Sequence, residues 1–311
     1  MANLVERRAF NIMGIFDSLG EHLNTGDPVV KEWFLVKSNF WPIFLSSMYL
    51  LIVKVIGPSI MRDRKPFELR ILMMVYNLFL VATYTVTVST VLYCIRQVDS
   101  SVLCKDTVVI YGTCTYTMAA CGWIIYMLKY VEFLDTIFFV LRKKDNLITN
   151  LHVIHHCVLP LCGWVFFRTE RSGFQAYPII INSVVHIAMY GYYGLAAMGP
   201  GVRKYLWWKR YLTIAQMIQF ILILFFVMVV MPVSGCTAAK SSIYINVVAA
   251  TLFFALFYNF YQHTFKPTKS KTNGVHKKRE IEDKKEENGN IHTEMSYNET
   301  YTNGNSKVKC N

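Results

Sequence analysis

Three histidines lie close together in an otherwise apolar segment, at His152, His155 and His156. On a helix with about 3.6 residues per turn, their imidazoles fall within an arc of about 100° on one face. Imidazole changes its charge near neutral pH and can act as a nucleophile, so a convergent trio suits metal binding, acid–base catalysis or nucleophilic catalysis. The competing interpretation is a cluster that only hydrogen-bonds neighbouring helices. We favour chemistry, because three histidines share the face.

A second polar group precedes the histidines. In it, Lys129, Glu132 and Asp135 follow one another at intervals of three residues. This spacing predicts a polar stripe along one flank of a helix. A solvated face with an ordinary Lys–Glu pair would have the same spacing. A stripe inside the protein would instead orient the histidines or hold a polar ligand, and the sequence leaves both interpretations open.

A fourth histidine, His186, belongs to a third group. Asn182, His186, Tyr190 and Tyr193 share one helical face, within an arc of about 80°. His186 can therefore meet the trio across a bundle of helices. The tyrosines could also serve packing alone, with their hydroxyls bonded to the backbone.

Two glutamines, Gln216 and Gln219, form a fourth group with Thr213 in a strongly apolar segment. Amide side chains inside a membrane helix often hydrogen-bond to neighbouring helices. Contact with a substrate would use the same residues, so structural and functional interpretations both stand.

The elements that must position these groups are membrane helices. Hydrophobic residues make up 54% of the chain and charged residues only 17%, whereas soluble proteins average about 25% charged. The apolar surplus lies in blocks of roughly 18 residues or more, each long enough to cross a hydrocarbon core. No alternating barrel pattern is present, so the spans must be helical. Composition therefore excludes a disordered protein and an ordinary soluble one.

We predict an all-α membrane protein with seven transmembrane helices. Residues 1–34 are expected to form a luminal segment with a short amphipathic helix. Residues 35–265 form the membrane domain, and residues 266–311 a disordered cytosolic tail. The predicted spans are 35–57, 69–92, 108–128, 151–167, 176–197, 212–231 and 243–263.

Charge in the short loops predicts the orientation. The loops after the first, third and fifth spans carry eleven lysines and arginines, and the opposite loops carry five. Cationic loops stay in the cytosol, which places the N-terminus in the lumen and the C-terminus in the cytosol. The net charge of +12 therefore fits a membrane topology without nucleic-acid binding. Lys307 and Lys309, near the C-terminus, match a signal for the endoplasmic reticulum membrane, although a lysine-rich tail also produces this pattern by chance.

Taken together, the four groups resemble the sequence boxes of the ELO family, the very-long-chain fatty acid elongases. The resemblance covers about residues 25–265, and the boxes occur in the family's order and spacing. The matching residues are Lys129, Glu132, Asp135 and Thr136 in a KxxExxDT box; His152, His155 and His156 in an HxxHH box; Asn182, His186, Met189, Tyr190, Tyr192 and Tyr193 in an NxxxHxxMYxYY box; and Thr213, Gln216 and Gln219 in a TxxQxxQ box.

The resemblance implies that six of the seven helices ring a substrate tunnel open to the cytosol. It implies condensation of a long-chain acyl-CoA with malonyl-CoA to 3-ketoacyl-CoA, CoA and carbon dioxide, with no metal and no permanently bound cofactor. His155 is the expected nucleophile, assisted by His152, His156 and His186. The residues expected to bind substrate are Lys129, Glu132, Asp135, Asn182, Tyr190, Tyr193, Gln216 and Gln219.

The resemblance also implies partners. These are the ketoacyl-CoA reductase, dehydratase and enoyl-CoA reductase of the elongation cycle, and a homo-oligomer is compatible with it. The chain departs from the family after the second span, where many members carry a cysteine available for a luminal disulfide. Here the nearest cysteines are Cys94 and Cys104, and either could pair with Cys236.

Three other interpretations are weaker. Cys157 adjoins the trio and could be a nucleophile, but the residues of the box are histidines. A membrane di-iron desaturase or hydroxylase also uses HxxHH, yet it needs histidines in several boxes to hold two irons, and only five of the eight histidines lie outside the N-terminal segment and the tail. A seven-helix receptor shares the predicted topology but has no need of buried histidines.

Overall fold

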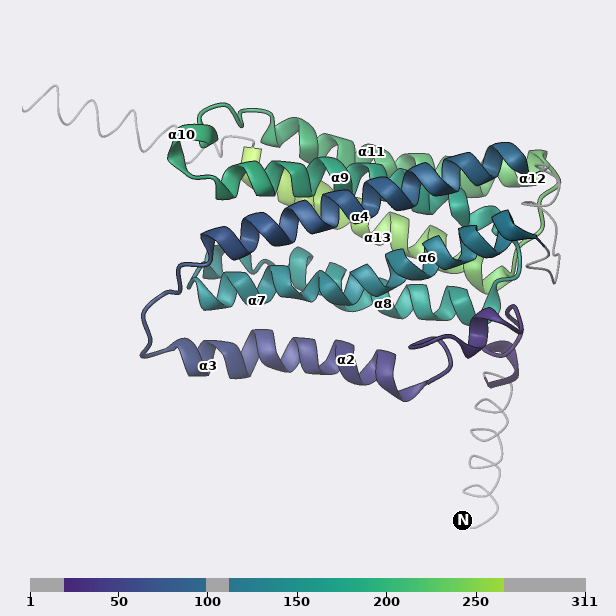
Figure 1. The fold of residues 1–311 in the computed structure, drawn as a ribbon, viewed down its shortest axis with the longest axis horizontal. Helices are drawn as coiled ribbons and strands as arrows, with labels where there is room; N and C mark the ends of the chain where they lie inside the picture. Colours follow the sequence, from purple (N-terminus) through teal and green to yellow (C-terminus); the bar gives the residue numbers. More distant parts are fainter. Residues whose placement is uncertain (1–19, 99–111, 266–311) are drawn as a thin grey trace, which may run out of the picture. The chain divides into compact units, whose positions relative to one another are not determined.

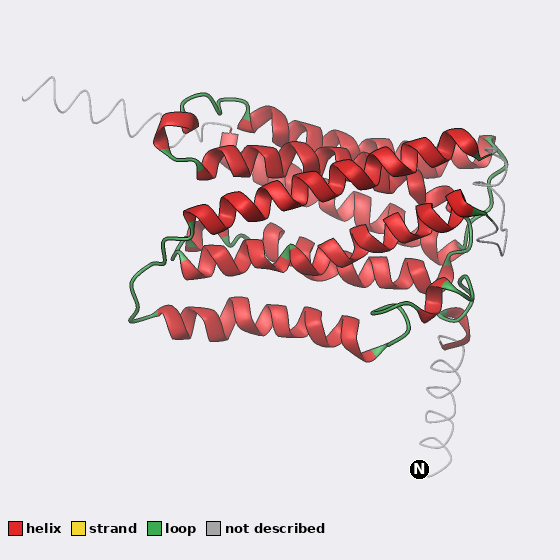
Figure 2. Cartoon of the chain, in the orientation of Figure 1, coloured by secondary structure: helices red, strands yellow, loops and turns green. Residues whose placement is uncertain are grey.

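The computed structural model describes residues 20–98 and 112–265, and these are mostly helical (Figure 2). No strand occurs within those two ranges. The described residues up to 260 form one compact unit, and the last turn of the final helix, residues 261–265, belongs to a second. The amphipathic helix predicted near the N-terminus, and the tail with its lysine pattern, lie outside the described residues.

Six helical stretches in the described part of the chain are long and apolar enough to cross a membrane. The prediction of an all-helical, multi-pass membrane protein is therefore confirmed. The helix of the third predicted span is not among the six, so the count of seven stays a prediction. The stretches are α2–α3 (Phe40–Met61), α4 (Arg70–Gln97), α8 (Asn150–Thr169), α9 (Ala176–Ala197) with the turn before it, α11–α12 (Lys209–Val233) and α13 (Lys240–Phe265); the shorter elements are α6 (Thr113–Val131), α7 (Phe133–Leu141) and α10 (Pro200–Arg203).

The first span begins later than predicted. Leu35 has a φ of 62°, a left-handed conformation that a helix cannot contain. The Ser38 hydroxyl instead accepts hydrogen bonds from the backbone N–H groups of Phe40 (3.2 Å) and Trp41 (3.3 Å), and so satisfies two donors at the helix start. The predicted start at residue 35 was wrong because hydropathy does not register this local cap.

The first span also ends later than predicted, at Met61. A π-helical turn, Ile52–Ile56, precedes Pro58 by two residues, and a second one, Phe226–Val230, precedes Pro232 in the same way. A proline offers no N–H to the carbonyl four residues earlier and its ring crowds that carbonyl. The wider π turn relieves this conflict, so both spans continue through their prolines.

The helix of the third predicted span continues past its predicted end at residue 128 and is interrupted at Glu132. α6 ends at Val131, Glu132 has φ −62° and ψ −13°, and α7 begins at Phe133. The predicted single helical stripe through Lys129 and Asp135 was therefore wrong, because the two residues lie on different helices. The predicted start of this span, near residue 108, lies outside the described residues.

The helices that carry the polar groups are neighbours in the bundle. α4 lies along α9 and α6, α9 also contacts α11, and α2 packs on α8 (Figure 1). Between α4, α6, α7 and α9 lies a core that contains Leu80 and Tyr84. The outer face of α4 carries exposed apolar side chains such as Leu78 and Val86, as expected for a surface against lipid.

Candidate active site

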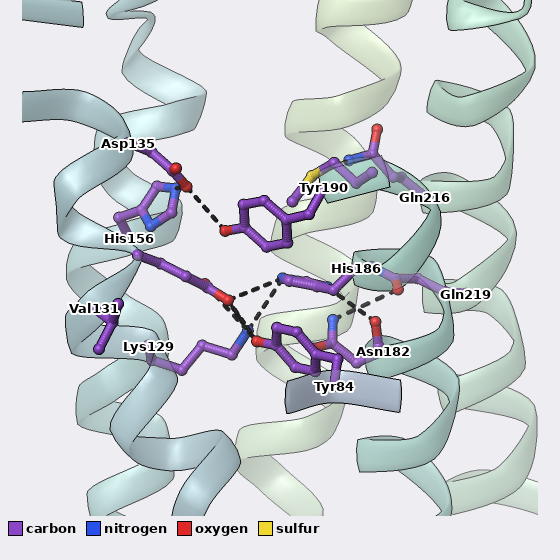
Figure 3. A network of polar contacts seen from close by, with 12 residues as sticks. Tyr84, Lys129, Val131, Asp135, His156, Asn182, His186, Tyr190, Gln216 and Gln219 are labelled. Carbon is purple, nitrogen blue, oxygen red and sulfur yellow. Dashed lines mark hydrogen bonds and ion pairs between the residues drawn. The ribbon is translucent and has the colours of Figure 1, made fainter. Parts of the chain in front are cut away.

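Four side chains from three helices meet in a buried cluster, which we call the lysine cluster: Tyr84, Lys129, Glu132 and His186. The Lys129 ammonium lies 3.1 and 3.2 Å from the two Glu132 oxygens. It also lies 2.8 Å from the Tyr84 hydroxyl and 3.1 Å from His186 Nε2. The Tyr84 hydroxyl donates to Glu132 Oε1 at 2.5 Å. Figure 3 shows Tyr84, Lys129 and His186 converging; they belong to α4, α6 and α9, and Glu132 lies at the α6–α7 junction.

The lysine cluster is inside the protein. Lys129 is 7% exposed and Glu132 1%. The interpretation of this spacing as an ordinary ion pair on a solvated helix face is therefore wrong for these two residues. A buried carboxylate is costly unless it is paired and hydrogen-bonded, and Lys129 and Tyr84 supply both kinds of contact. Ionisable groups held at such cost between membrane helices usually have a function.

His186 is fixed in one tautomer by its two neighbours. Its Nδ1 lies 2.9 Å from the backbone carbonyl of Asn182. A carbonyl can only accept, so Nδ1 must carry the proton. Nε2 then accepts from the Lys129 ammonium at 3.1 Å. Both ring nitrogens of His186 are thus engaged, and the ring is neutral.

A second contact joins α7 to α9 beside the lysine cluster. The Tyr190 hydroxyl donates to Asp135 Oδ2 at 2.9 Å. His156 Nε2 lies 4.0 Å from the same carboxylate oxygen. Tyr190 is fully buried, and Figure 3 shows its ring directed at Asp135 next to His156. Asp135 therefore links the trio to the helix of His186.

His152 is held by a chain of hydroxyls. Its Nε2 lies 2.9 Å from Thr136 Oγ1, and the Tyr49 hydroxyl lies 2.8 Å from the same oxygen. The local sequence positions the ring, because Thr149 caps α8 by accepting from the backbone N–H of His152 at 3.2 Å. The first turn of α8 is thereby fixed with His152 facing α7 and α2.

His155 differs from the other three histidines. Neither of its ring nitrogens hydrogen-bonds to any residue in the described ranges, and Nδ1 is completely buried without a partner. Its ring packs against Phe253 (centroids 4.8 Å apart) and Phe257 (6.1 Å) of α13. The orphaned nitrogen is unusual, because most buried polar atoms have a hydrogen-bond partner.

His155 lines a cavity of about 290 Å³. Residues of α4, α6, α8, α9, α11 and α13 line it, together with Asp27 and Val30 of the N-terminal segment. The lining is largely apolar along the helices. Lys129 and Asn182 share the cavity wall with His155, and more than ten residues further along α8 the wall includes Phe166 and Phe167. The cavity therefore has a polar end at Lys129 and Asn182 and, beyond it, an apolar slot about 16 Å long. Its far end includes the charged residues Asp27, Glu170 and Arg171.

The structure does not bring every predicted residue to this site. Tyr193 is 39% exposed, makes no hydrogen bond among the described residues, and packs its ring against Tyr190 and Tyr192. Gln216 donates to Met189 Sδ at 3.4 Å. Gln219 Oε1 accepts from Asn182 Nδ2 at 3.5 Å, which links α11 to α9.

Two further residues also lie away from the cavity wall. Thr213 bonds back to the carbonyl of Lys209, as threonines in membrane helices commonly do. Cys157 packs against the buried cluster around Tyr49 and Val53. Among the described residues, it is not part of the cavity wall.

Two residues of the site had no signal in the sequence analysis. Tyr84 and Tyr49 lie in the second and first predicted spans, among many other aromatic residues. Both are almost completely buried, at 0% and 2% exposure. A buried tyrosine hydroxyl needs a hydrogen-bond partner. A tyrosine inside an apolar span could therefore have indicated a polar contact with another helix.

Cysteines and metal ligands complete the inventory of reactive groups. Cys236 is disulfide-bonded and Cys94 is a free thiol, which excludes Cys94 as its partner. Cys104 lies outside the described residues. Within residues 20–98 and 112–265, no three His, Cys, Asp or Glu side chains are grouped so as to hold a metal ion.

Comparison with known proteins places the chain in a family. Residues 34–273 match the family model described as ELO: GNS1/SUR4 family. The chain is 38% identical to very long chain fatty acid elongase 7 of Drosophila melanogaster, over 78% of this chain and 74% of the relative. It is 35% identical to human very long chain fatty acid elongase 4 (78% and 77%) and 34% identical to human elongase 1 (82% and 90%). The protein whose buried lysine and histidine clusters are described above therefore belongs to the ELO (GNS1/SUR4) family.

Proposed function

We propose that this protein catalyses the condensation step of fatty acid elongation. It would join a long-chain acyl-CoA to malonyl-CoA and release 3-ketoacyl-CoA, CoA and carbon dioxide. Relatives that are 35% and 38% identical over 78% of this chain are named very long chain fatty acid elongases, which supports the reaction class. No resident cofactor or metal enters this proposal.

One observation carries the proposal for the chemistry. Of the four histidines of the site, only His155 lines the cavity in the described chain. His152 and His186 hydrogen-bond through their rings and His156 Nε2 lies 4.0 Å from a carboxylate oxygen, whereas His155 has no hydrogen-bond partner among the described residues. A nucleophile must keep a lone pair free and accessible to the substrate. His155 is therefore our nucleophile.

In the first half-reaction, a ring nitrogen of His155 attacks the thioester carbonyl carbon. The carbonyl oxygen takes the negative charge, and the tetrahedral intermediate then collapses with cleavage of the C–S bond. CoA leaves as the thiolate, which takes a proton from water, and an N-acyl imidazole that carries one positive charge (an imidazolium) remains on His155. The Lys129 ammonium and the Asn182 amide share the cavity wall with His155, so they are the groups placed to stabilise the oxyanion.

In the second half-reaction, malonyl-CoA replaces CoA and loses carbon dioxide. The electron pair of the broken C–C bond becomes an enolate at the methylene carbon. That carbon attacks the acyl imidazole, the C–N bond breaks, and 3-ketoacyl-CoA leaves with His155 restored. Capturing the acyl group on the enzyme divides one difficult condensation into two easier steps, and its kinetic mark is a ping-pong pattern.

The remaining polar residues act as positioning groups in this scheme. The two hydrogen bonds of His186 hold it neutral beside Lys129. His152 hydrogen-bonds to Thr136 and His156 lies 4.0 Å from Asp135, and either could polarise the malonyl carbonyl. Tyr190 and Glu132 keep Asp135 and Lys129 in place.

The apolar slot beyond His155 is our candidate for the acyl chain. Six helices surround it, as the family resemblance implies for a tunnel. The free energy of binding of an alkyl chain becomes more favourable in proportion to the apolar surface that it buries, so a long slot selects long chains.

Loops that the charge bias assigns to the cytosol would bind the CoA phosphates. The endoplasmic reticulum membrane and the other enzymes of the elongation cycle belong to this proposal as location and partners.

A microsomal assay tests the proposal. Membranes that contain the protein are offered acyl-CoAs of graded length with labelled malonyl-CoA, and the 3-keto product is measured. We expect product from long-chain acyl-CoAs and none from His155→Ala. The control His22→Ala, an exposed histidine of the N-terminal segment, should keep full activity. Normal incorporation by His155→Ala would contradict the covalent mechanism.

A further inference from the structure

A second cavity lies away from the catalytic residues, between the first membrane helix and α7. It has a volume of about 410 Å³. Its polar lining consists of Lys54, Arg62, Lys143 and Asp145, so three cations face one carboxylate. We call it the basic pocket. Two positive charges in excess, in a cavity large enough for a phosphorylated head group, favour an anionic ligand.

Lys54 is the residue that most needs an explanation. It lies inside the stretch Phe40–Met61, seven residues before its end, and this stretch is long and apolar enough to cross a membrane. Its side chain is exposed and makes no hydrogen bond or ion pair with any residue in the described ranges. A lysine inside a membrane segment is costly and commonly marks a ligand or ion site. It also belongs to the π-helical turn Ile52–Ile56, a feature found frequently at functional sites.

The opposite wall of the pocket is built from the end of α7. Lys143 has a left-handed backbone (φ 50°), and its ammonium donates to the carbonyl of Arg62 at 3.0 Å. This contact ties the end of α7 to the end of α3. Gly57 allows the two helices to approach, because a Cβ there would lie 2.7 Å from Val140 Cγ1. Figure 1 shows α3 and α7 as neighbours at this end of the bundle.

The apolar floor of the basic pocket borders the hydroxyl chain that holds His152. The floor includes Val53, Val140 and Ile148. Val53 and Val140 lie about one helical turn after Tyr49 and Thr136 of that chain, and Ile148, in the loop before α8, lies four residues before His152. The basic pocket therefore lies about one helical turn beyond these groups, toward the end of the bundle that the charge bias assigns to the cytosol.

We propose that the basic pocket binds a phosphate group at the membrane interface, held by Lys54, Arg62 and Lys143. Two sources carry this chemistry, the head group of an anionic phospholipid and the phosphates of coenzyme A. Basic pockets between membrane helices on the cytosolic side are typical sites for anionic head groups. The coenzyme A source rests on the proposed function, and the lipid source does not.

Binding to the purified full-length protein in a neutral detergent tests the proposal, with native mass spectrometry as the readout. The probes are dioleoyl phosphatidic acid, dioleoyl phosphatidylcholine and free coenzyme A. We expect phosphatidic acid or coenzyme A to bind better than phosphatidylcholine. Lys54→Gln should weaken that binding about fivefold, as expected for one basic residue near an anionic surface, and Lys54→Arg should restore it.

Lys240→Gln is the matched control, because Lys240 is also an exposed cation but does not line the basic pocket. If phosphatidic acid shows the Lys54 dependence, the source is a lipid; if coenzyme A shows it, the source is the substrate. Equal binding to Lys54→Gln and the wild type, or equal weakening by Lys240→Gln, would overturn the site. Condensation is measured separately, so a failure of the proposed function leaves the lipid result unaffected.

Discussion

His155 and the lysine cluster occupy the same end of the main cavity but have opposite surroundings. In the lysine cluster, the ammonium of Lys129 has three partner residues and the ring of His186 has a partner at each nitrogen. His155 has neither a hydrogen bond nor an ion pair in the described chain. Hydrogen bonds hold the groups of the lysine cluster in place, where the charge of Lys129 can stabilise an oxyanion, whereas an unbonded imidazole keeps its lone pair free to attack. The difference separates positioning and charge-stabilising residues from the nucleophile.

This comparison predicts that substitutions of two histidines of α8 lower the rate of acyl transfer by unequal factors. His155→Asn should lower the rate of acyl transfer from acyl-CoA by about a thousandfold or more, because it removes the nucleophile. His152→Asn should cost about a hundredfold, because its role is to assist. Single-turnover release of CoA, measured without malonyl-CoA, gives both numbers. Equal losses of rate in the two variants would mean that His155, which has no hydrogen bond, and His152, which has one, do not differ in role.

Glu132→Gln tests whether the lysine cluster is held by charge. The substitution leaves the buried Lys129 ammonium without its carboxylate, so the free energy of unfolding should fall by about 3–5 kcal/mol. Thermal unfolding in detergent measures this loss. The double variant Lys129→Met with Glu132→Gln should recover much of the stability and remain inactive. A single variant as stable as the wild type would show that the pair is not needed for the fold.

Tyr84→Phe removes one hydroxyl that bonds to both Lys129 and Glu132. Hydrogen bonds to charged groups contribute about 1.5–3 kcal/mol, so the unfolding free energy should fall by about that much. Tyr93→Phe, on the same helix but 63% exposed, is the matched control and should leave stability unchanged. Indistinguishable unfolding curves for the two variants would remove Tyr84 from the cluster.

Filling the apolar slot should change specificity more than rate. Ala119 of α6 lines the cavity, ten residues from Lys129 and therefore about 15 Å away along the helix. Ala119→Phe should shift the preferred acyl-CoA to shorter chains, with little change for the shortest substrates. Ala82→Phe, on an exposed position of α4, should shift nothing. An unchanged length profile for Ala119→Phe would show that the chain does not occupy this slot.

The sequence predicted most of the membrane helices because hydropathy depends on composition alone. It did not predict their ends, which depend on local contacts. The Ser38 cap, the left-handed Leu35 and the π turns before Pro58 and Pro232 each moved a boundary. Each is a property of one or two residues, and the average over a span conceals it.

The candidate site was predicted by residue type, but its partners were not. The spacing of Lys129, Glu132 and Asp135 was compatible with a solvated face or a buried stripe, and only burial decided between them. Tyr84 and Tyr49 come from spans without a recognisable polar pattern. Contacts between residues about 50 or more positions apart depend on how helices pack, and a single sequence does not encode them locally.

The most direct test of the nucleophile is to look for the acyl group on the enzyme. Purified protein is incubated with palmitoyl-CoA in the absence of malonyl-CoA, and its mass is measured intact and after digestion. The account predicts release of CoA, a palmitoyl adduct on His155, and no adduct on His155→Asn. An adduct on Cys157, an adduct that persists in His155→Asn, or CoA release only after malonyl-CoA is added would contradict it.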